Sequence, residues 1–148
     1  MTARAAAALR EPRWELFPHE ADVGVRGIGS SKEAAFAAAA LALTATITDP
    51  AKVLASTAVP IAVDGPDDGL LLLALLDALI YEIATRRMLF SEVEVTITGS
   101  RLAARAWGEP IDIARHQPAA EVKGATFAEL VVGRRPDGRW IAQCVVDV

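Results

Sequence analysis

The sequence predicts an α+β fold in which two helices pack on one face of a mainly antiparallel β-sheet. Two helix-forming segments, residues 31–47 and 68–86, are separated by one short strand-like segment. Two strand-like segments precede the first helix, and several more follow the second helix. This order is not the regular strand–helix alternation of a doubly wound parallel sheet, and it favours strands that pair antiparallel through short turns.

The first two strands are expected over residues 14–18 and 22–30, joined by a bend at residues 19–21. In the second strand, valine alternates with glycine and arginine, as expected of a half-buried strand. The segment also carries three glycines in an order that does not match a dinucleotide-binding loop: Gly24, Gly27 and Gly29. We expect them to be sheet glycines that let a helix pack closely.

The first helix is expected to follow a capping box, in which Ser30 is followed three residues later by Glu33. Its alanine content is attributed to codon usage. Residues 58–63 are expected to form a strand, and Pro60 within it indicates an edge position or a bulge. The second helix, residues 68–86, carries a wide stripe of leucine and isoleucine that should lie flat on the sheet.

Strict alternation of polar and apolar residues over 92–98 predicts a strand, joined by Gly99 and Ser100 in a hairpin to residues 101–107. A polar connection is expected over residues 108–117, with His116 solvated. The remaining strands are expected over residues 120–124, 129–134 and 140–148.

A single domain is expected over residues 14–148, because 148 residues is about the size of one ordinary domain. Residues 1–13 are expected to be a disordered N-terminal lead-in. The formal net charge of −4 disfavours direct binding to a nucleic-acid backbone, which depends on clustered cations. The most apolar window, residues 70–80, is too short to cross a bilayer.

The single cysteine, Cys144, has no intrachain partner for a disulfide. One thiol and two histidines also cannot supply a cysteine-rich zinc site. We therefore expect a reducing, cytoplasmic setting, in which Cys144 is a small core residue rather than a reactive thiol.

Two features of the sequence bear carboxylates that could hold a metal ion. The first is His19-x-x-Asp22, at the bend between the first two strands. The second is the end of the sequence, where Asp147 and the α-carboxylate of Val148 lie close together by covalent geometry. Such groups repel each other unless a cation or hydrogen-bond donors compensate, and a hard divalent cation prefers an oxygen-rich shell. Solvation of the same groups by water and salt remains the open alternative.

The chain resembles the archease family in several segments that occur in the family's order. Residues 19–26, His-Glu-Ala-Asp-Val-Gly-Val-Arg, are similar to the family's opening H-T-A-D-[IV]-G-[IV]-R. The resemblance covers residues 14–148. It continues through residues 32–36, 79–81, 108–116, 121–123, 126–127 and 146–148.

This resemblance implies a small α+β partner of RtcB-type RNA ligases that acts in tRNA splicing or RNA repair and is not itself an enzyme. It would promote formation of the ligase–guanylate intermediate and multiple turnover, with GTP and manganese held by the ligase. Carried over by position, the family's metal ligands fall on Asp22, Asp147 and Val148, with calcium as the expected divalent ion. RNA would be contacted only through the ligase, and neither DNA nor a membrane is an expected partner.

The sequence departs from the family pattern at Glu20, where a threonine is usual, and this adds an acidic group beside the expected site. His19, Glu20 and Lys123 are further candidates to line the site or contact the partner. Two other functions stay open from the residues alone. One is a metal-dependent phosphoesterase with His19 as base, and the other is a chaperone-like interaction module without metal.

Overall fold

The computed structural model describes residues 13–148, and its strands form two antiparallel sheets rather than one. Most of the expected lead-in over residues 1–13 lies outside the described residues, but Arg13 is the first residue of β1. The five-stranded sheet has the order β1-β2-β8-β6, and β7 also pairs with β8. Its strands are β1 (Arg13–His19), β2 (Asp22–Gly29), β6 (Gly124–Ala125), β7 (Val131–Arg134) and β8 (Trp140–Asp147).

The second sheet has three strands in the order β3-β5-β4. They are β3 (Thr57–Asp64), β4 (Met88–Thr98) and β5 (Arg101–Pro110). The expected hairpin joins β4 to β5, and β3 is an edge strand, as Pro60 predicted. The α+β class and the antiparallel pairing are therefore confirmed, whereas the expectation of one sheet is wrong.

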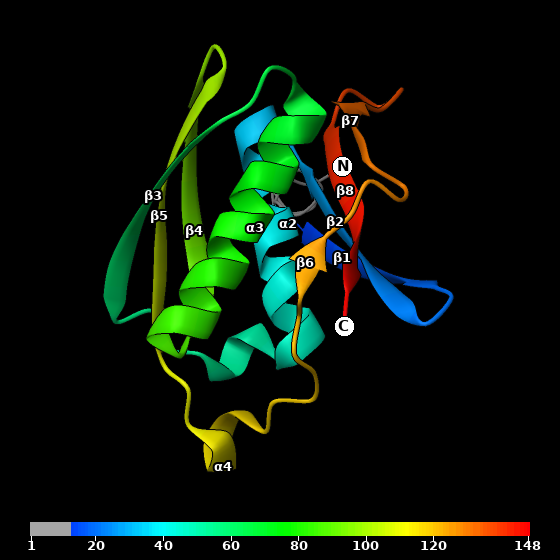
Figure 1. Ribbon diagram of the computed structural model, residues 1–148. Helices are drawn as coiled ribbons and strands as arrows, with labels where there is room; N and C mark the ends of the chain where they lie inside the picture. Colours follow the sequence, from blue (N-terminus) through cyan, green and yellow to red (C-terminus); the bar gives the residue numbers. More distant parts are fainter. Residues whose placement is uncertain (1–12) are drawn as a thin grey trace, which may run out of the picture.

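Two long helices lie between the sheets (Figure 1): α2 (Lys32–Ile47) and α3 (Asp68–Arg86). α2 packs against β1, β2 and β8 on one side and against β4 on the other. A helix enclosed in this way must be apolar around its whole circumference, and small side chains let both sheets approach it. Its buried alanines therefore have a packing role: Ala35, Ala38, Ala39, Ala40 and Ala42.

Glycine in β2 allows the closest of these approaches. A Cβ atom on Gly27 would lie 2.0 Å from the carbonyl oxygen of Ala35 and 2.3 Å from the backbone nitrogen of Ala39. The prediction that the β2 glycines allow close helix packing is confirmed for Gly27 and also for Gly29, which faces Ala34 in the same helix. Gly24 serves a different contact, because the ring of Phe17 occupies the space of its missing side chain.

The helix ends differ from expectation at one cap. Ser31, not Ser30, is the N-cap of α2, and its hydroxyl accepts a hydrogen bond from the backbone nitrogen of Ala34 at 3.1 Å. The Ser30–Glu33 capping box is therefore wrong: the helix begins at Lys32, so the residue three positions after the N-cap is Ala34, which has no carboxylate to complete a box. α3 has the predicted bounds, with Asp67 as its N-cap.

The chain after β5 differs most from the sequence prediction. β5 continues to Pro110, and a short helix, α4 (Ile113–His116), follows within the expected connection. Earlier in the chain, a 3-10 helix that the sequence did not predict, η1 (Pro50–Lys52), lies between α2 and β3. The strand expected over residues 120–124 is reduced to β6, whose two residues pair with the end of β8.

Cys144 lies in the core, as predicted. It is fully buried in β8, and burial raises the pKa of its thiol to about 12. Its neighbours on the same face, Ala142 and Val146, are fully buried as well. In residues 13–148 no helix is long and apolar enough to span a membrane.

Candidate metal centre

The pairing of β2 with β8 brings Asp22 to the end of the sequence. The last printed pair of this antiparallel ladder is Val23 opposite Val146, so the register continued by one residue places Asp22 opposite Asp147. Asp22 Oδ1 accepts a hydrogen bond from the backbone N–H of Val148 at 3.3 Å. The structure therefore gathers the three predicted residues at one end of the five-stranded sheet.

A second segment fixes Asp147 from its other side. The backbone nitrogen of Lys123 donates to the carbonyl oxygen of Asp147 at 2.8 Å, and Gly124 pairs with Asp147 in the ladder between β6 and β8. Asp147 thus lies between β2 and β6, which restricts its backbone. The side chain of Lys123 is exposed at the same end.

Asp77 is an acidic residue at this end of the sheet that sequence reasoning did not assign. It lies on α3, and its Oδ1 accepts a hydrogen bond from the backbone nitrogen of Ala125 at 2.9 Å. This contact ties β6 to the helix and so supports the strand that holds Asp147. The sequence signal that could have identified Asp77 is that it is the single charged residue in the otherwise apolar residues 70–80.

The β1–β2 turn holds His19 and Glu20 beside Asp22. His19 pairs with Asp22 in the hairpin, and Glu20 lies in the turn with φ of 54°. In residues 13–148 no side-chain hydrogen bond links His19 or Glu20 to Asp22, Asp147 or Val148. Both residues therefore stay predicted contacts.

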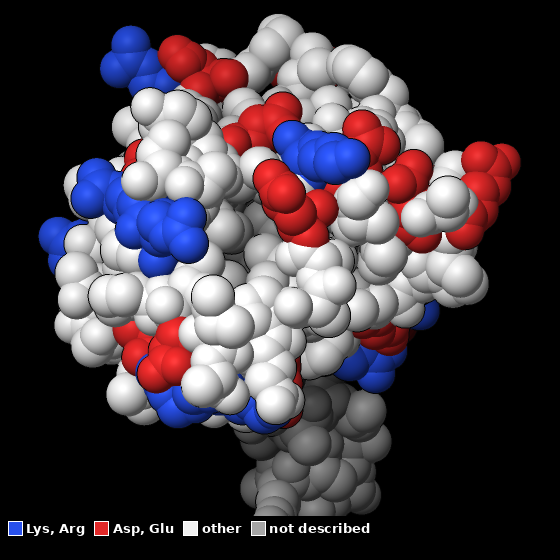
Figure 2. All heavy atoms as spheres, turned by 60° about the horizontal axis from the view of Figure 1, so that its bottom comes forward, with Lys and Arg blue, Asp and Glu red and all other residues white. Residues whose placement is uncertain are grey.

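The surface around this end carries an uneven charge. The C-terminus lies at the lower end of the five-stranded sheet in Figure 1, and Figure 2 turns that end forward. Acidic side chains gather there, next to a hollow in the surface (Figure 2). Like charges opposite one another destabilise an antiparallel pair, so Asp22 and Asp147 would be stabilised by a bound cation.

The donor set fits a hard cation, provided that main-chain oxygens take part. Within the described part of the chain, no three His, Cys, Asp or Glu side chains are grouped so that they could hold a metal ion. Asp22 and Asp147 would supply two carboxylates, and Val148 would add main-chain oxygens. Calcium accepts such a mixture of carboxylate and main-chain oxygens, whereas zinc prefers nitrogen and sulfur.

A second polar cluster contradicts the expectation that His116 is solvated. His116 is only 1% exposed, and its Nε2 lies 3.1 Å from Glu109 Oε2. Its Nδ1 accepts a hydrogen bond from the backbone nitrogen of Asp112 at 2.9 Å, so the proton is carried by Nε2, which donates to Glu109. The prediction failed because the residues around His116 in the sequence are polar, while its burial comes from the return of α4 onto β5.

Glu109 is the acceptor at the centre of this cluster. Both of its oxygens accept from the guanidinium of Arg115, and Oε2 also accepts from the backbone nitrogen of Leu54 at 2.7 Å. The Arg115 hydrogen bond is the main reason that the pKa of Glu109 is lowered to about 2. Thr48 Oγ1 adds a hydrogen bond to the carbonyl oxygen of His116 at 2.6 Å. The cluster joins the end of α2 to β5 and α4, and we assign it a structural role.

Comparison with known proteins identifies the family. Residues 14–148 match the Archease protein family (MTH1598/TM1083). The chain belongs to this family. It is 39% identical over 140 residues to the Protein archease of Pyrococcus abyssi, with 92% of this chain and 99% of that protein covered. It is 37% identical to the Protein archease of Methanopyrus kandleri, with 91% and 99% covered.

Two solved structures of archease-like chains agree with the fold. The solution structure of Methanobacterium thermoautotrophicum Protein 1598 superposes with a TM-score of 0.74 at 28% identity, covering 91% of this chain and 98% of that one. The crystal structure of a Thermotoga maritima archease, described as a possible chaperone, gives a TM-score of 0.56 at 14% identity, covering 90% and 96%. At that identity the second similarity concerns the fold alone. The predicted archease resemblance and the fold class are confirmed.

Proposed function

We propose that this protein is a metal-binding accessory protein that activates an RtcB-type RNA ligase in tRNA splicing or RNA repair. Membership of the archease family supports an accessory role. The observation that carries the proposal is the contact between Asp22 and Val148. It brings together two residues, far apart in the sequence, at positions that match the family's metal ligands. The protein acts in the cytoplasm and performs no ligation itself.

The proposed cation is divalent, with calcium favoured by an all-oxygen donor set. Asp22, Asp147 and the main-chain oxygens of Val148 would hold it, and the ion would supply positive charge at an otherwise acidic surface. The chain's own residues do the positioning. β8 presents Asp147, the backbone of Lys123 restrains it, and Asp77 holds the neighbouring strand in place.

The charge of the chain supports an indirect relation to RNA. A formal net charge of −4 and the acidic end of the sheet disfavour a phosphate backbone, which requires clustered cations. A ligase surface that binds RNA and GTP is basic, and an acidic partner is complementary to it. The acidic end is therefore the surface proposed to face the ligase, where it would promote guanylylation.

The test is a ligation assay with the RtcB-type ligase at a concentration well below that of its RNA, with GTP and manganese supplied. The ligase with wild-type protein should complete many turnovers, and without the protein it should stall. Asp22→Asn should lose most of the stimulation, since it removes a proposed ligand with little change in size. Asp64→Asn is the matched control, because Asp64 is an exposed aspartate at the end of β3 in the other sheet.

Three other outcomes would contradict parts of the proposal. Equal stimulation by folded Asp22→Asn would contradict the metal assignment. Full activation without any calcium binding would indicate an interaction module that needs no metal. Hydrolysis of a phosphodiester by the isolated protein, lost in His19→Ala, would indicate a metal-dependent hydrolase instead.

A further inference from the structure

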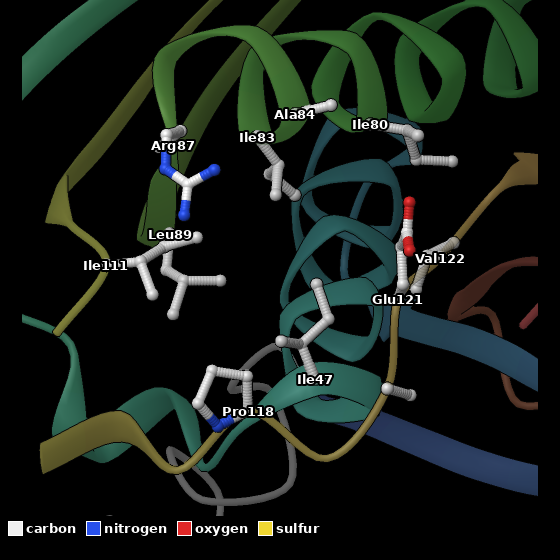
Figure 3. A pocket seen from close by; sticks show the side chains of 11 residues that line it. Ile47, Ile80, Ile83, Ala84, Arg87, Leu89, Ile111, Pro118, Glu121 and Val122 are labelled. Atoms are coloured by element: carbon white, nitrogen blue, oxygen red, sulfur yellow. The ribbon is translucent and has the colours of Figure 1, made fainter. Parts of the chain in front are cut away.

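A pocket of about 340 Å³ lies between the C-terminal ends of α2 and α3. Its walls come from the last turn of α2, the last turns of α3, and the segments around residues 111 and 118–122 (Figure 3). Glu121 lines the pocket. Two residues later, the backbone nitrogen of Lys123 donates a hydrogen bond to the carbonyl oxygen of Asp147, so one short segment joins the pocket to the candidate metal centre. Most of its lining is aliphatic: Ile47, Ile80, Ile83, Leu89, Ile111 and Val122.

Two charged residues face each other across these apolar walls. In Figure 3 the guanidinium of Arg87 points into the pocket from the end of α3, and Glu121 lies on the opposite wall. In residues 13–148 the Arg87 side chain makes no ion pair and donates no hydrogen bond. Its neighbour Arg86, in contrast, pairs with Glu82 within the helix. Within the described residues, the guanidinium of Arg87 is thus without an ion-pair or hydrogen-bond partner.

The backbone at Arg87 is also in a conformation that favours glycine. Arg87 is the C-cap of α3, with φ of 56° and ψ of 50°. This left-handed region is adopted by glycine at no steric cost, whereas other residues are strained there. Strain of this kind at a residue whose side chain enters a pocket is consistent with a functional use of that side chain.

The pocket is held open by backbone hydrogen bonds. The backbone nitrogen of Ile111 donates to the carbonyl oxygen of Arg87 at 2.9 Å. The backbone nitrogen of Ala119 donates to the carbonyl oxygen of Ile47 at 2.8 Å. The cluster of Glu109, Arg115 and His116 fixes the chain between these two contacts. A pocket formed before binding spares a ligand the cost of ordering it.

We propose that this pocket docks a segment of a partner protein that carries a large apolar side chain next to a carboxylate. The apolar side chain would fill the aliphatic walls, and the carboxylate would pair with the unpaired guanidinium of Arg87. Interface hot spots are enriched in arginine and in large aromatic side chains, and they lie in well-packed pockets. Glu121 on the opposite wall favours a basic residue on the other side of the anchor and disfavours a second acid.

The identity of the partner rests on the proposed function: the segment belongs to the RtcB-type ligase. We take the ligase surface that engages Asp147 to extend over the pocket, because residues 121–123 lead from the pocket lining to the backbone contact with Asp147. The metal centre would then contribute charge to the complex, and the pocket would receive the apolar anchor of the ligase.

The test measures the affinity of the full chain for the purified ligase by calorimetry. Arg87→Gly should weaken binding about tenfold or more, while its melting temperature should be no lower than that of the wild type, because glycine relieves the strained φ. Ile83→Ser should also weaken binding by removing part of the apolar wall. Arg86→Ala is the matched control, since it removes the same charge from the adjacent, paired residue, and its affinity should stay within about twofold.

The outcomes separate the two proposals. If the wild-type protein does not bind the ligase, the proposed function fails and this inference fails with it. If the wild-type protein binds and Arg87→Gly binds equally well, only the docking assignment is overturned. Calcium binding should be the same in Arg87→Gly and wild type, and a loss of calcium binding would mean that Arg87 acts through the metal centre instead of the pocket.

Discussion

The carboxylate of Asp22 accepts a hydrogen bond from the backbone nitrogen of Val148 at 3.3 Å, although the two residues are 126 positions apart in the sequence. Pairing of β2 with β8 creates this contact, so the candidate metal centre is a consequence of strand register. A slip of one residue in that register would turn every side chain of the strand to the opposite face. The site can therefore form only when the five-stranded sheet is correctly paired.

Loss of either proposed carboxylate ligand should weaken calcium binding. Asp22→Asn and Asp147→Asn should each lower the calcium affinity about tenfold or more, because affinity at oxygen-rich sites depends on the number of charged ligands. Isothermal titration calorimetry measures the effect. Asp64→Asn should bind calcium as the wild type does, and equal affinities in all three variants would exclude both residues as ligands.

The carboxyl group of Val148 can be tested separately by appending two residues, Gly-Ser, after it. The α-carboxylate of Val148 then becomes a neutral peptide carbonyl, and a negative charge is removed from beside Asp147. Calcium affinity should fall, while the melting temperature without calcium should change little because Val148 is exposed. An extended chain with unchanged calcium affinity would remove Val148 from the ligand set.

The close packing of α2 on β2 predicts a large effect at Gly27. Gly27→Ala places a Cβ 2.0 Å from the carbonyl oxygen of Ala35, and a backbone atom cannot move aside as a flexible side chain can. The free energy of unfolding should fall by about 3 kcal/mol in urea denaturation. Gly133→Ala in β7 is the control, because nothing lies within 4 Å of its added Cβ, and it should change stability little. Similar stabilities for the two variants would contradict the described packing.

The Glu109 cluster predicts a specific loss of stability in acid. The pKa of Glu109 is lowered from 4.5 to about 2 in the folded protein, mainly by Arg115. Glu109 therefore stabilises the fold fully above pH 4.5, and this contribution is lost as the pH falls from about 4.5 towards 2. Melting temperatures measured across this range should fall less steeply for Glu109→Gln than for wild type.

Glu109→Gln should also be less stable than wild type at pH 7, because the charged partner of Arg115 is gone. Glu94→Gln, at an exposed position of β4, should keep the wild-type dependence on pH. A Glu109→Gln variant whose melting temperature declines in acid as steeply as that of the wild type would show that Glu109 does not cause the decline.

Burial of Cys144 predicts a slow thiol reaction. Its pKa is raised to about 12, so the thiolate is scarce at neutral and mildly alkaline pH, and the side chain is out of contact with solvent. Iodoacetamide at pH 8 should modify the folded protein far more slowly than the urea-unfolded protein, as followed by mass spectrometry. Equal rates would place Cys144 at an accessible position.

Local patterns predicted the individual elements well where hydrophobic period and turn residues agree. The helix over residues 68–86 and the hairpin around Gly99 have strong local signals, and the structure contains both. The division into two sheets depends on how α2 is enclosed, which is a long-range property. The alanines of α2 carried that information, since only a helix packed on both sides needs small residues all round.

In the candidate site, too, some residues could be predicted from the sequence and others depended on tertiary contacts. Asp22, Asp147 and Val148 were grouped from their chemistry and a family resemblance, and strand pairing then placed them together. His116 was misjudged because its burial depends on contacts with Glu109 and Thr48 from other elements. The pocket at Arg87 had no sequence signal, because its walls come from separate elements that only the tertiary structure joins.

The rate of ligase guanylylation is the most direct test of the central claim that Asp22, Asp147 and Val148 hold a cation through which this protein activates an RNA ligase. Purified ligase would be incubated with labelled GTP and manganese, alone or with wild-type protein, Asp147→Asn or Asp64→Asn, in the presence of calcium. We predict that the wild type and Asp64→Asn accelerate guanylylation equally, and that Asp147→Asn, although folded, leaves the rate close to that of the ligase alone. Wild-type acceleration by Asp147→Asn would contradict the account.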